Sequence, residues 1–214
     1  METSEYYTMF RVEKEHWWYK GLRELVLHYA KSKNGQNIRI LDAGCGTGMT
    51  MKTLIEKGNQ VDGFDLSSTA IKLGKKRGLK SIKKASILNV PYPDRSFNSL
   101  INIDVLGSLS NKDAKRAIEE FYRVLKPHGT LILQAAALEQ LRSPHDVVTH
   151  LRKRYSKQEL QKLFSGEKWS IVKLSYRMFF LFPVIFAVKI LKKLVKKDSA
   201  ATDLWLPTPI LNNI

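Results

Sequence analysis

The sequence predicts an α/β fold in which a doubly wound parallel sheet carries helices on both faces, followed by a basic amphipathic C-terminal appendage. Short apolar segments, typical of strands, alternate along residues 38–136 with amphipathic segments typical of helices. A glycine-rich turn joins the first of these strands to the helix after it. From residue 177 the chain becomes apolar and basic. We therefore expect residues 1–176 to form one domain and residues 177–214 to form an extension.

We expect six strands, at residues 38–44, 60–65, 79–85, 97–104, 130–136 and 168–176. We expect helices at residues 11–33 (one or two helices), 47–57, 67–78, 111–126 and 156–166, with a polar loop and a short helix over 138–155. Ser67 or Ser68 is an N-cap candidate, and Ser156 with Glu159 has capping-box spacing. No seventh strand follows residue 204, which leaves open a truncated C-terminus or a sheet of six strands.

Length and cysteine content limit the class of protein. A chain of 214 residues is long enough for one domain with a sizeable core. Its single cysteine, Cys45, excludes an internal disulfide and a cysteine zinc site, and it suits a reducing compartment. The N-terminus has no apolar run typical of a secretory signal, and no segment reaches the roughly 18 apolar residues of a membrane span. We therefore expect a cytoplasmic protein without a bound structural metal.

The charge is strongly positive and uneven. The chain has a formal net charge of +16. Residues 142–197 contain 14 Lys and Arg against 3 Asp and Glu, a net charge of +11. Such a balance indicates an anionic partner, either nucleic acid or a membrane surface, or simply a lysine-rich solvated surface.

The segment ILDAGCGTGMT, residues 40–50, places three glycines within five positions. Because glycine inside an element costs stability, this pattern indicates a tight strand-to-helix turn whose backbone closely approaches a ligand. The spacing is G-x-G-x-G, which differs from the dinucleotide fingerprint G-x-G-x-x-G and from the P-loop. Asp65 ends the second strand, 17 residues after Gly48, where a carboxylate can accept hydrogen bonds from both ribose hydroxyls. The pattern predicts a site for an adenosine that bears a zwitterionic amino-acid tail.

Over residues 38–135 the chain resembles class I S-adenosylmethionine-dependent methyltransferases, which have a Rossmann-like fold. The motifs that carry the resemblance are ILDAGCGTG, VDGFDLSSTAIKLGKKRG, ILNVPYPDRSFNSLINIDVL and FYRVLKPHGTLIL, in this order. The flanks resemble one subgroup of these enzymes, through HWWY at residues 16–19, the stretch 145–155, and an LW-LP-P-LN pattern at 204–212.

The resemblance implies S-adenosyl-L-methionine as cofactor. It implies that the glycine turn meets the methionine part of the cofactor, that Asp42 orients the turn or meets the amino group, and that Asp65 binds the ribose. Leu66 would pack on the adenine, and Asp104 would lie beside the exit of the methyl group. The complete set of implied cofactor-binding residues is Asp42, Gly44, Cys45, Gly46, Gly48, Asp65, Leu66, Ser86, Ile87 and Asp104.

Three positions depart from the family pattern. Ser86 stands where the family usually has an acid, and Gly107 and Ser108 replace a Glu and a His on the substrate side. These departures, with the absent seventh strand, keep open a non-catalytic cofactor-binding protein as an alternative.

Methyl transfer from a sulfonium is an in-line displacement, so the protein mainly supplies position and alignment. A general base is needed only when the acceptor is a hydroxyl or a protonated amine. The candidates for this catalytic role are Asp104, His16 and His145, with His150 as a further one. We expect a small-molecule or lipid-like acceptor, and an RNA methyltransferase is the alternative that the charge favours.

Two aromatic or amphipathic segments flank this core. Trp17, Trp18 and Tyr19 are expected to form a helical lid over the cofactor or to pack the first helix on the sheet. Residues 178–197 combine an apolar side with a row of lysines, a pattern typical of a helix lying on an anionic membrane surface. Packing on the sheet or in a dimer interface is the alternative for this segment, and the oligomeric state stays open.

Overall fold

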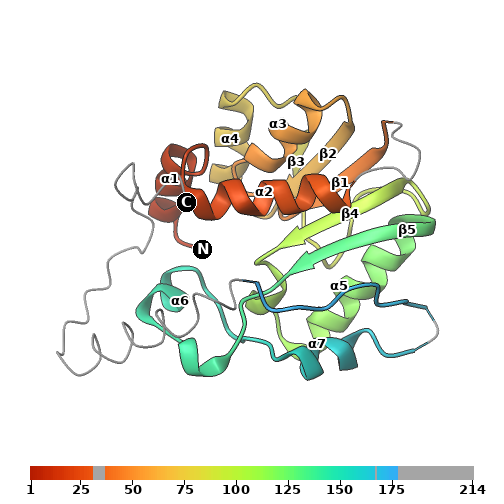
Figure 1. Ribbon diagram of the computed structural model, residues 1–214. Helices are drawn as coiled ribbons and strands as arrows, with labels where there is room; N and C mark the ends of the chain where they lie inside the picture. The colour runs from red at the N-terminus through yellow and green to blue at the C-terminus, as the bar shows by residue number, and fades with distance from the viewer. Residues whose placement is uncertain (31–36, 167, 178–214) are drawn as a thin grey trace.

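The computed structural model describes residues 1–30, 37–166 and 168–177. Its centre is a five-stranded, all-parallel sheet with the order β3-β2-β1-β4-β5 (Figure 1). The strands are β1 (Arg39–Ala43), β2 (Gln60–Asp65), β3 (Ile82–Lys84), β4 (Phe97–Ile103) and β5 (Leu125–Gln134). The predicted α/β class and the first five predicted strands are confirmed.

The helices are α1 (Thr3–Val12), α2 (Trp17–Tyr29), α3 (Met49–Glu56), α4 (Ser68–Lys76), α5 (Asn111–Val124), α6 (Pro144–Val148) and α7 (Lys157–Leu163), with short 3-10 turns at Leu106–Ser108 and Glu139–Leu141. Ser67 caps α4, and Ser156 with Glu159 forms the predicted capping box of α7. Residues 11–33, expected to hold one or two helices, contain α2 and only the last two residues of α1, which begins at Thr3. The sequence therefore placed the start of α1 too late.

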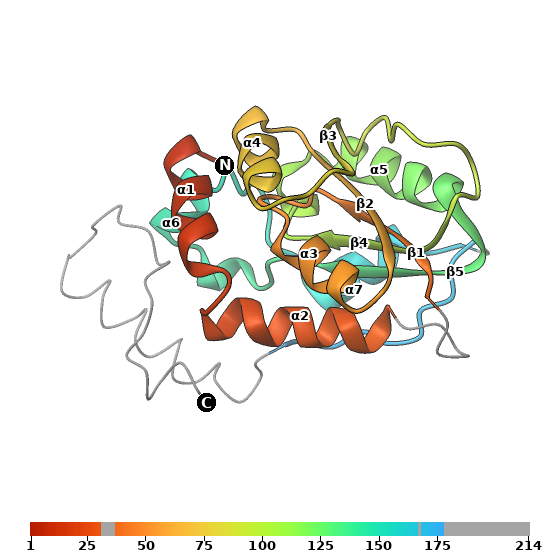
Figure 2. The same cartoon turned by 90° about the horizontal axis from the view of Figure 1, so that it is seen from above.

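Both faces of the sheet are covered, as predicted. Ile40 and Leu41 are neighbours on β1, and their side chains point to opposite faces because strand residues alternate. Ile40 packs in the core cluster that includes Val26 of α2, whereas Leu41 packs in the cluster that includes Phe121 of α5. Figure 2 shows α2 and α5 on opposite sides of the strands.

The predicted strand at residues 168–176 is wrong, because no described residue of this segment pairs with the sheet. Side-chain contacts hold the segment instead. The Trp169 ring packs edge-on against Phe164 at 5.5 Å between centroids, and the Tyr176 hydroxyl accepts a hydrogen bond from the backbone N–H of Lys157 at 3.3 Å. Val172 is 94% exposed. Within the described sheet, β5 is therefore an edge strand.

The start of β5 also differs from the prediction, since we expected the preceding helix to reach residue 126 and the strand to begin at residue 130. The strand begins at Leu125, which pairs with Phe97, and the register then shifts before Ser99. His128, within this part of β5, adopts a left-handed backbone with φ of 61°.

Residues 178–197, for which we predicted an amphipathic membrane-binding helix, lie outside the described residues, as do residues 198–214, so Arg177 is the one described residue of the predicted extension. Among the helices that the structure describes, none combines the length and apolar character needed to cross a bilayer.

Candidate functional site

The glycine turn after β1 is built as its spacing predicts. Gly44, Gly46 and Gly48 all have left-handed backbones, with φ of 87°, 54° and 80°. A Cβ atom on Gly46 would stand 2.8 Å from the Met9 methyl group of α1. The backbone N–H groups of Gly44 and Cys45 donate to the Phe64 carbonyl at 2.8 and 3.0 Å, which fixes the turn against β2. The turn therefore requires glycine both for its backbone angles and for its close neighbours.

Asp65, the last residue of β2, holds the turn from the other side. Its Oδ2 accepts a hydrogen bond from the Gly46 N–H at 3.0 Å, and its Oδ1 accepts one from the Ser67 N–H at 2.8 Å. The Tyr6 hydroxyl of α1 donates to Oδ1 at 3.4 Å. Burial raises the pKa of the Asp65 carboxyl, and these hydrogen bonds oppose the rise. The Asp65 carboxylate thus joins the glycine turn to the end of β2, two segments that the sequence analysis related only by their spacing.

A large cavity opens at this edge of the sheet and collects most of the predicted site residues. Its walls include Gly44, Gly46, Asp65, Leu66, Ser86, Ile87, Asp104, His16 and His145. Asp42, Cys45 and Gly48 are absent from these walls. Leu66 is 68% exposed, as an unfilled apolar contact would be. The roles expected of these residues remain predictions.

Asp42 lies beneath the turn and is almost completely buried. Burial raises the pKa of its carboxyl to about 7, and the nearby Asp65 and Glu13 carboxylates add to the rise. A cation near the turn would reverse this effect by favouring the charged form. Asp42 does not line the cavity, so a positively charged ligand would act on it through electrostatic attraction at a distance. That attraction would lower the pKa of its carboxyl.

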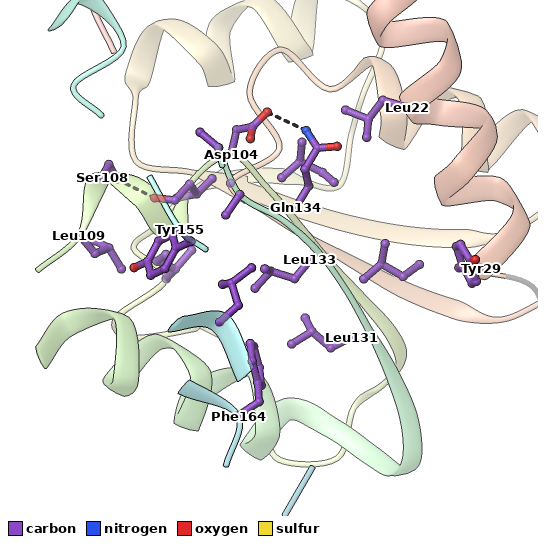
Figure 3. A pocket seen from close by; sticks show the side chains of 18 of the residues that line it. Leu22, Tyr29, Asp104, Ser108, Leu109, Leu131, Leu133, Gln134, Tyr155 and Phe164 are labelled. Carbon is purple, nitrogen blue, oxygen red and sulfur yellow. Dashed lines mark hydrogen bonds between the residues drawn. The ribbon is translucent and has the colours of Figure 1, made fainter. Parts of the chain in front are cut away.

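Asp104 follows β4 with a left-handed backbone, φ 55°. The Gln134 side chain donates from Nε2 to Asp104 Oδ2 at 3.0 Å, and the Asp104 N–H donates to the Gln134 carbonyl at 2.9 Å (Figure 3). Asp104 is an exposed residue that lines the cavity, and the surrounding protein atoms lie close enough to reduce the hydration of its charge. This loss of hydration raises the pKa of Asp104 to about 6, although the Gln134 hydrogen bond and the positive charges of Arg177 and Arg154 oppose it.

The three histidine candidates have different surroundings. His16 is the N-cap of α2, and its Nδ1 accepts the Trp18 N–H at 3.2 Å, so it has a structural task. His145 of α6 has a buried Nδ1 without a partner among the described residues. His150 Nδ1 lies 3.2 Å from the N-terminal amine and does not line the cavity. Of these three candidates, His16 and His145 thus line the same cavity as Asp104.

The first turn of α2 forms another wall of the cavity. Trp17, Trp18 and Tyr19 all line it, and their role as a lid over the cofactor remains a prediction. The Arg177 guanidinium stacks on the Trp18 ring at 4.3 Å from its centroid and donates to the Trp18 carbonyl at 2.9 Å. Burial raises the pKa of Tyr19 well above its ordinary value.

Sequence reasoning did not single out several residues of the site. Tyr6 and Met9 reach it from α1, Gln134 from the end of β5, and Arg177 from the first position of the predicted C-terminal extension. The only available signal was chain order for Gln134, which follows the fifth-strand motif. The others reach the site through tertiary packing.

The Gly107 departure has a structural reason. The Gly107 carbonyl accepts the N–H groups of Arg152 and Lys153 at 2.9 and 3.0 Å, and a Cβ atom there would stand 2.7 Å from the Lys153 carbonyl oxygen. Ser108 donates its hydroxyl to the Val105 carbonyl at 2.8 Å. Gly107 therefore lets the segment after α6 pack against this turn, where a Glu side chain would not fit.

Known proteins resemble the central part of the chain. Residues 41–133 match the family model described as "Methyltransferase domain". Over 104 residues the chain is 35% identical to the "Probable tRNA methyltransferase 9B" of Mus musculus, an alignment that covers 47% of this chain and 22% of that protein. It is 36% identical over 102 residues to the tRNA (carboxymethyluridine(34)-5-O)-methyltransferase of Arabidopsis thaliana, covering 47% of this chain and 24% of that protein.

A third relative acts on a different kind of acceptor. The Demethylmenaquinone methyltransferase of Tropheryma whipplei is 30% identical over 97 residues, which cover 44% of this chain and 40% of that enzyme. The chain thus spans well under half of the length of each of these relatives.

Solved structures share the fold. The [4+2]-cyclase SpnF superposes with a TM-score of 0.51 at 26% identity, covering 66% of this chain and 55% of that one. The YcgJ protein of Bacillus subtilis superposes with a TM-score of 0.52 at 22% identity, covering 66% of this chain and 65% of that one.

The site fits a cofactor with a positively charged amino-acid end and an adenosine end. Gly44 and Gly46 of the turn line the cavity, and the Asp65 carboxylate lies beside them at the end of β2. Leu66 presents an exposed apolar surface next to Asp65. These features agree with the cofactor that the family uses.

Proposed function

We propose that this chain, whose residues 41–133 form an S-adenosylmethionine-dependent methyltransferase domain, transfers a methyl group to a small-molecule or lipid-like acceptor. One observation carries the proposal. A single cavity runs from the glycine turn and Asp65, past Asp104, to apolar side chains on β5. Cofactor and acceptor can therefore meet in one continuous cavity.

When bound, S-adenosylmethionine supplies an activated methyl group on a sulfonium sulfur. The protein's tasks are then positioning and the exclusion of water. The turn at Gly44 and Gly46 and the Asp65 carboxylate would hold the cofactor end, and Trp17 to Tyr19 would cover the cavity from α2. Asp104 stands at the acceptor end, where its carboxylate can take a proton.

Two observations support a lipid-like acceptor. Leu131 and Leu133 of β5 and Phe164 after α7 give the cavity an apolar end. One relative, the Demethylmenaquinone methyltransferase of Tropheryma whipplei, bears a name that specifies an acceptor of this type. The predicted contact of residues 178–197 with an anionic membrane surface would suit such an acceptor and remains a prediction.

RNA methylation is the second candidate. Two relatives carry tRNA methyltransferase names, and the net charge of +16 would favour nucleic acid. The fold also serves other chemistry, since the superposing SpnF structure is a cyclase. A non-catalytic cofactor-binding protein is the third possibility.

The deciding experiment is to incubate the protein with methyl-labelled S-adenosylmethionine and cell extract, and then to separate lipid, small-molecule, RNA and protein fractions. Label in the lipid or small-molecule fraction is the expected result. Label in RNA would establish the second candidate. No label, with cofactor binding confirmed by calorimetry, would favour the non-catalytic protein.

A further inference from the structure

The cavity beyond Asp104 has an apolar wall on the edge strand. Leu131 and Leu133 are two residues apart on β5 and share one face, and both are half-buried while Ile132 between them is buried on the other face. Figure 3 shows them along the strand, with Phe164 beside Leu131. Because this face of β5 is incompletely covered within the described residues, an apolar ligand lying on it would remove hydrocarbon from water.

At the polar end of the same cavity, hydrogen bonds fix the orientation of the Gln134 side-chain amide beside Asp104. The Gln134 side chain donates to Asp104 Oδ2 at 3.0 Å through Nε2, and its Oε1 accepts from Arg177 Nη1 at 3.4 Å. The two contacts together define which end of the amide faces Asp104. Asp104 Oδ1 has no hydrogen-bond partner in the described part of the chain, so it is left to accept from a ligand.

The charges around Oδ1 limit what that ligand group can be. The Asp104 carboxylate repels a carboxylate or phosphate, and the nearby Arg177 guanidinium, held by Trp18, disfavours an ammonium group. A neutral hydrogen-bond donor fits between these two charges. A hydroxyl is such a donor, and it is also a methyl acceptor that needs a base.

We propose that the acceptor is an amphiphile whose neutral hydroxyl donates to Asp104 Oδ1 and whose apolar body lies along Leu131, Leu133 and Phe164. This inference rests on the proposed methyl transfer and names its substrate class. In the reaction, the acceptor oxygen forms a bond to the methyl carbon. The carbon–sulfur bond breaks with its electron pair staying on sulfur, and the hydroxyl proton passes to Asp104 Oδ1. Sulfonium and carboxylate charges are both neutralised, and the proton leaves later to water.

Probe binding tests the substrate class without requiring turnover. Phenol, 4-octylphenol and 4-octylanisole are titrated into the full chain by calorimetry. We expect 4-octylphenol to bind most tightly, because each buried methylene contributes up to about fourfold in affinity. We expect 4-octylanisole to bind at least about tenfold more weakly than 4-octylphenol, because it leaves Oδ1 without a donor. Equal affinity of the phenol and its methyl ether would overturn the role of Oδ1.

Variants locate the binding site. Phe164→Ala is expected to lower the affinity for 4-octylphenol at least about fivefold and to leave the affinity for phenol unchanged. Asp104→Asn is a suitable variant because asparagine tolerates the left-handed backbone at this position. It is expected to reduce the ratio of the affinities for 4-octylphenol and 4-octylanisole. The matched control is Ile55→Ala on α3, which removes a 43% exposed side chain away from the cavity. Equal losses in Phe164→Ala and Ile55→Ala would overturn the apolar part of the proposal.

Cofactor binding, measured on the same samples, separates the two proposals. Retained S-adenosylmethionine binding with no chain-length dependence of probe affinity would refute the amphiphile alone. Absence of cofactor binding would refute the proposed function itself.

Discussion

The Glu13 carboxylate lies 2.5 Å from the Arg77 guanidinium, and both side chains are less than one-tenth exposed. Glu13 also accepts a hydrogen bond from the Thr47 hydroxyl within the glycine turn. Arg77 follows α4, and its Nε donates to the Thr47 carbonyl at 3.1 Å. This buried pair therefore joins the N-terminal helices, the glycine turn and α4.

Arg77→Met is expected to destabilise the protein by about 3–5 kcal/mol, because it leaves the buried Glu13 charge without its partner. Urea unfolding followed by far-ultraviolet circular dichroism measures the change. The control is Arg39→Met, which breaks the more exposed Arg39–Asp62 pair and should cost about 1 kcal/mol or less. Equal costs for the two variants would contradict a special role for the Glu13–Arg77 pair.

Asp65→Ala is expected to weaken S-adenosylmethionine binding at least about tenfold, because it removes the acceptor of the Gly46 N–H and the predicted ribose contact. Isothermal titration calorimetry gives the affinity. Asp62→Ala lies on the same strand, pairs with Arg39 outside the cavity, and should bind the cofactor as the parent does. Unchanged affinity in Asp65→Ala would remove Asp65 from the cofactor site.

The pH dependence of methyl transfer should report Asp104. Its pKa is raised to about 6, so the carboxylate form that can take a proton predominates above this pH and is lost below it. We expect kcat/KM to fall about tenfold per pH unit below this value and to level off above it. Asp104→Asn should have a lower kcat/KM and should not show this decrease at acid pH. Asp62→Asn should show the same decrease as the parent. An unchanged acid limb in Asp104→Asn would assign the base to another group, with His145 the next candidate.

Asp42→Asn should stabilise the cofactor-free protein in a pH-dependent way. The pKa of Asp42 is raised to about 7 in the folded state, above its ordinary value. Both states are protonated in acid, so the parent carries no penalty there, and the penalty grows as the folded carboxyl is forced to ionise with rising pH. We expect a gain of at most about 4 kcal/mol at about pH 8 and almost none at about pH 4. Urea unfolding at both pH values measures it, and an equal gain at both would contradict the raised pKa.

Gly107→Glu would reintroduce the residue that the family usually has, and we expect it to destabilise this protein rather than to improve it. A side chain at Gly107 meets Leu151 and the Lys153 carbonyl oxygen, so the variant should lose about 1–3 kcal/mol by overpacking. Thermal unfolding compares it with Ser108→Ala, which loses one hydrogen bond to the Val105 carbonyl and should cost less. A more stable Gly107→Glu variant would show that the contacting segment can move away.

Several elements of the fold could be read from local sequence because their signals are local. β2 has the predicted bounds, Ser67 caps α4, and the capping box of α7 is present. The predicted strand at residues 168–176 failed for the opposite reason. Its apolar spacing is compatible with a strand, but a strand needs a partner, and this segment is held by Trp169 and Tyr176 side-chain contacts instead.

The sequence by itself determined the alternation of strands and helices, the glycine turn, and Asp65 at the end of β2, because periodicity, glycine spacing and strand order are properties of neighbouring residues. Only the tertiary structure decided that Glu13 and Arg77 hold the turn, that Gln134 and Arg177 orient Asp104, and that β5 leaves an apolar face open to the cavity. These contacts join residues that are distant along the chain. Their existence depends on how the layers pack, and no local pattern records it.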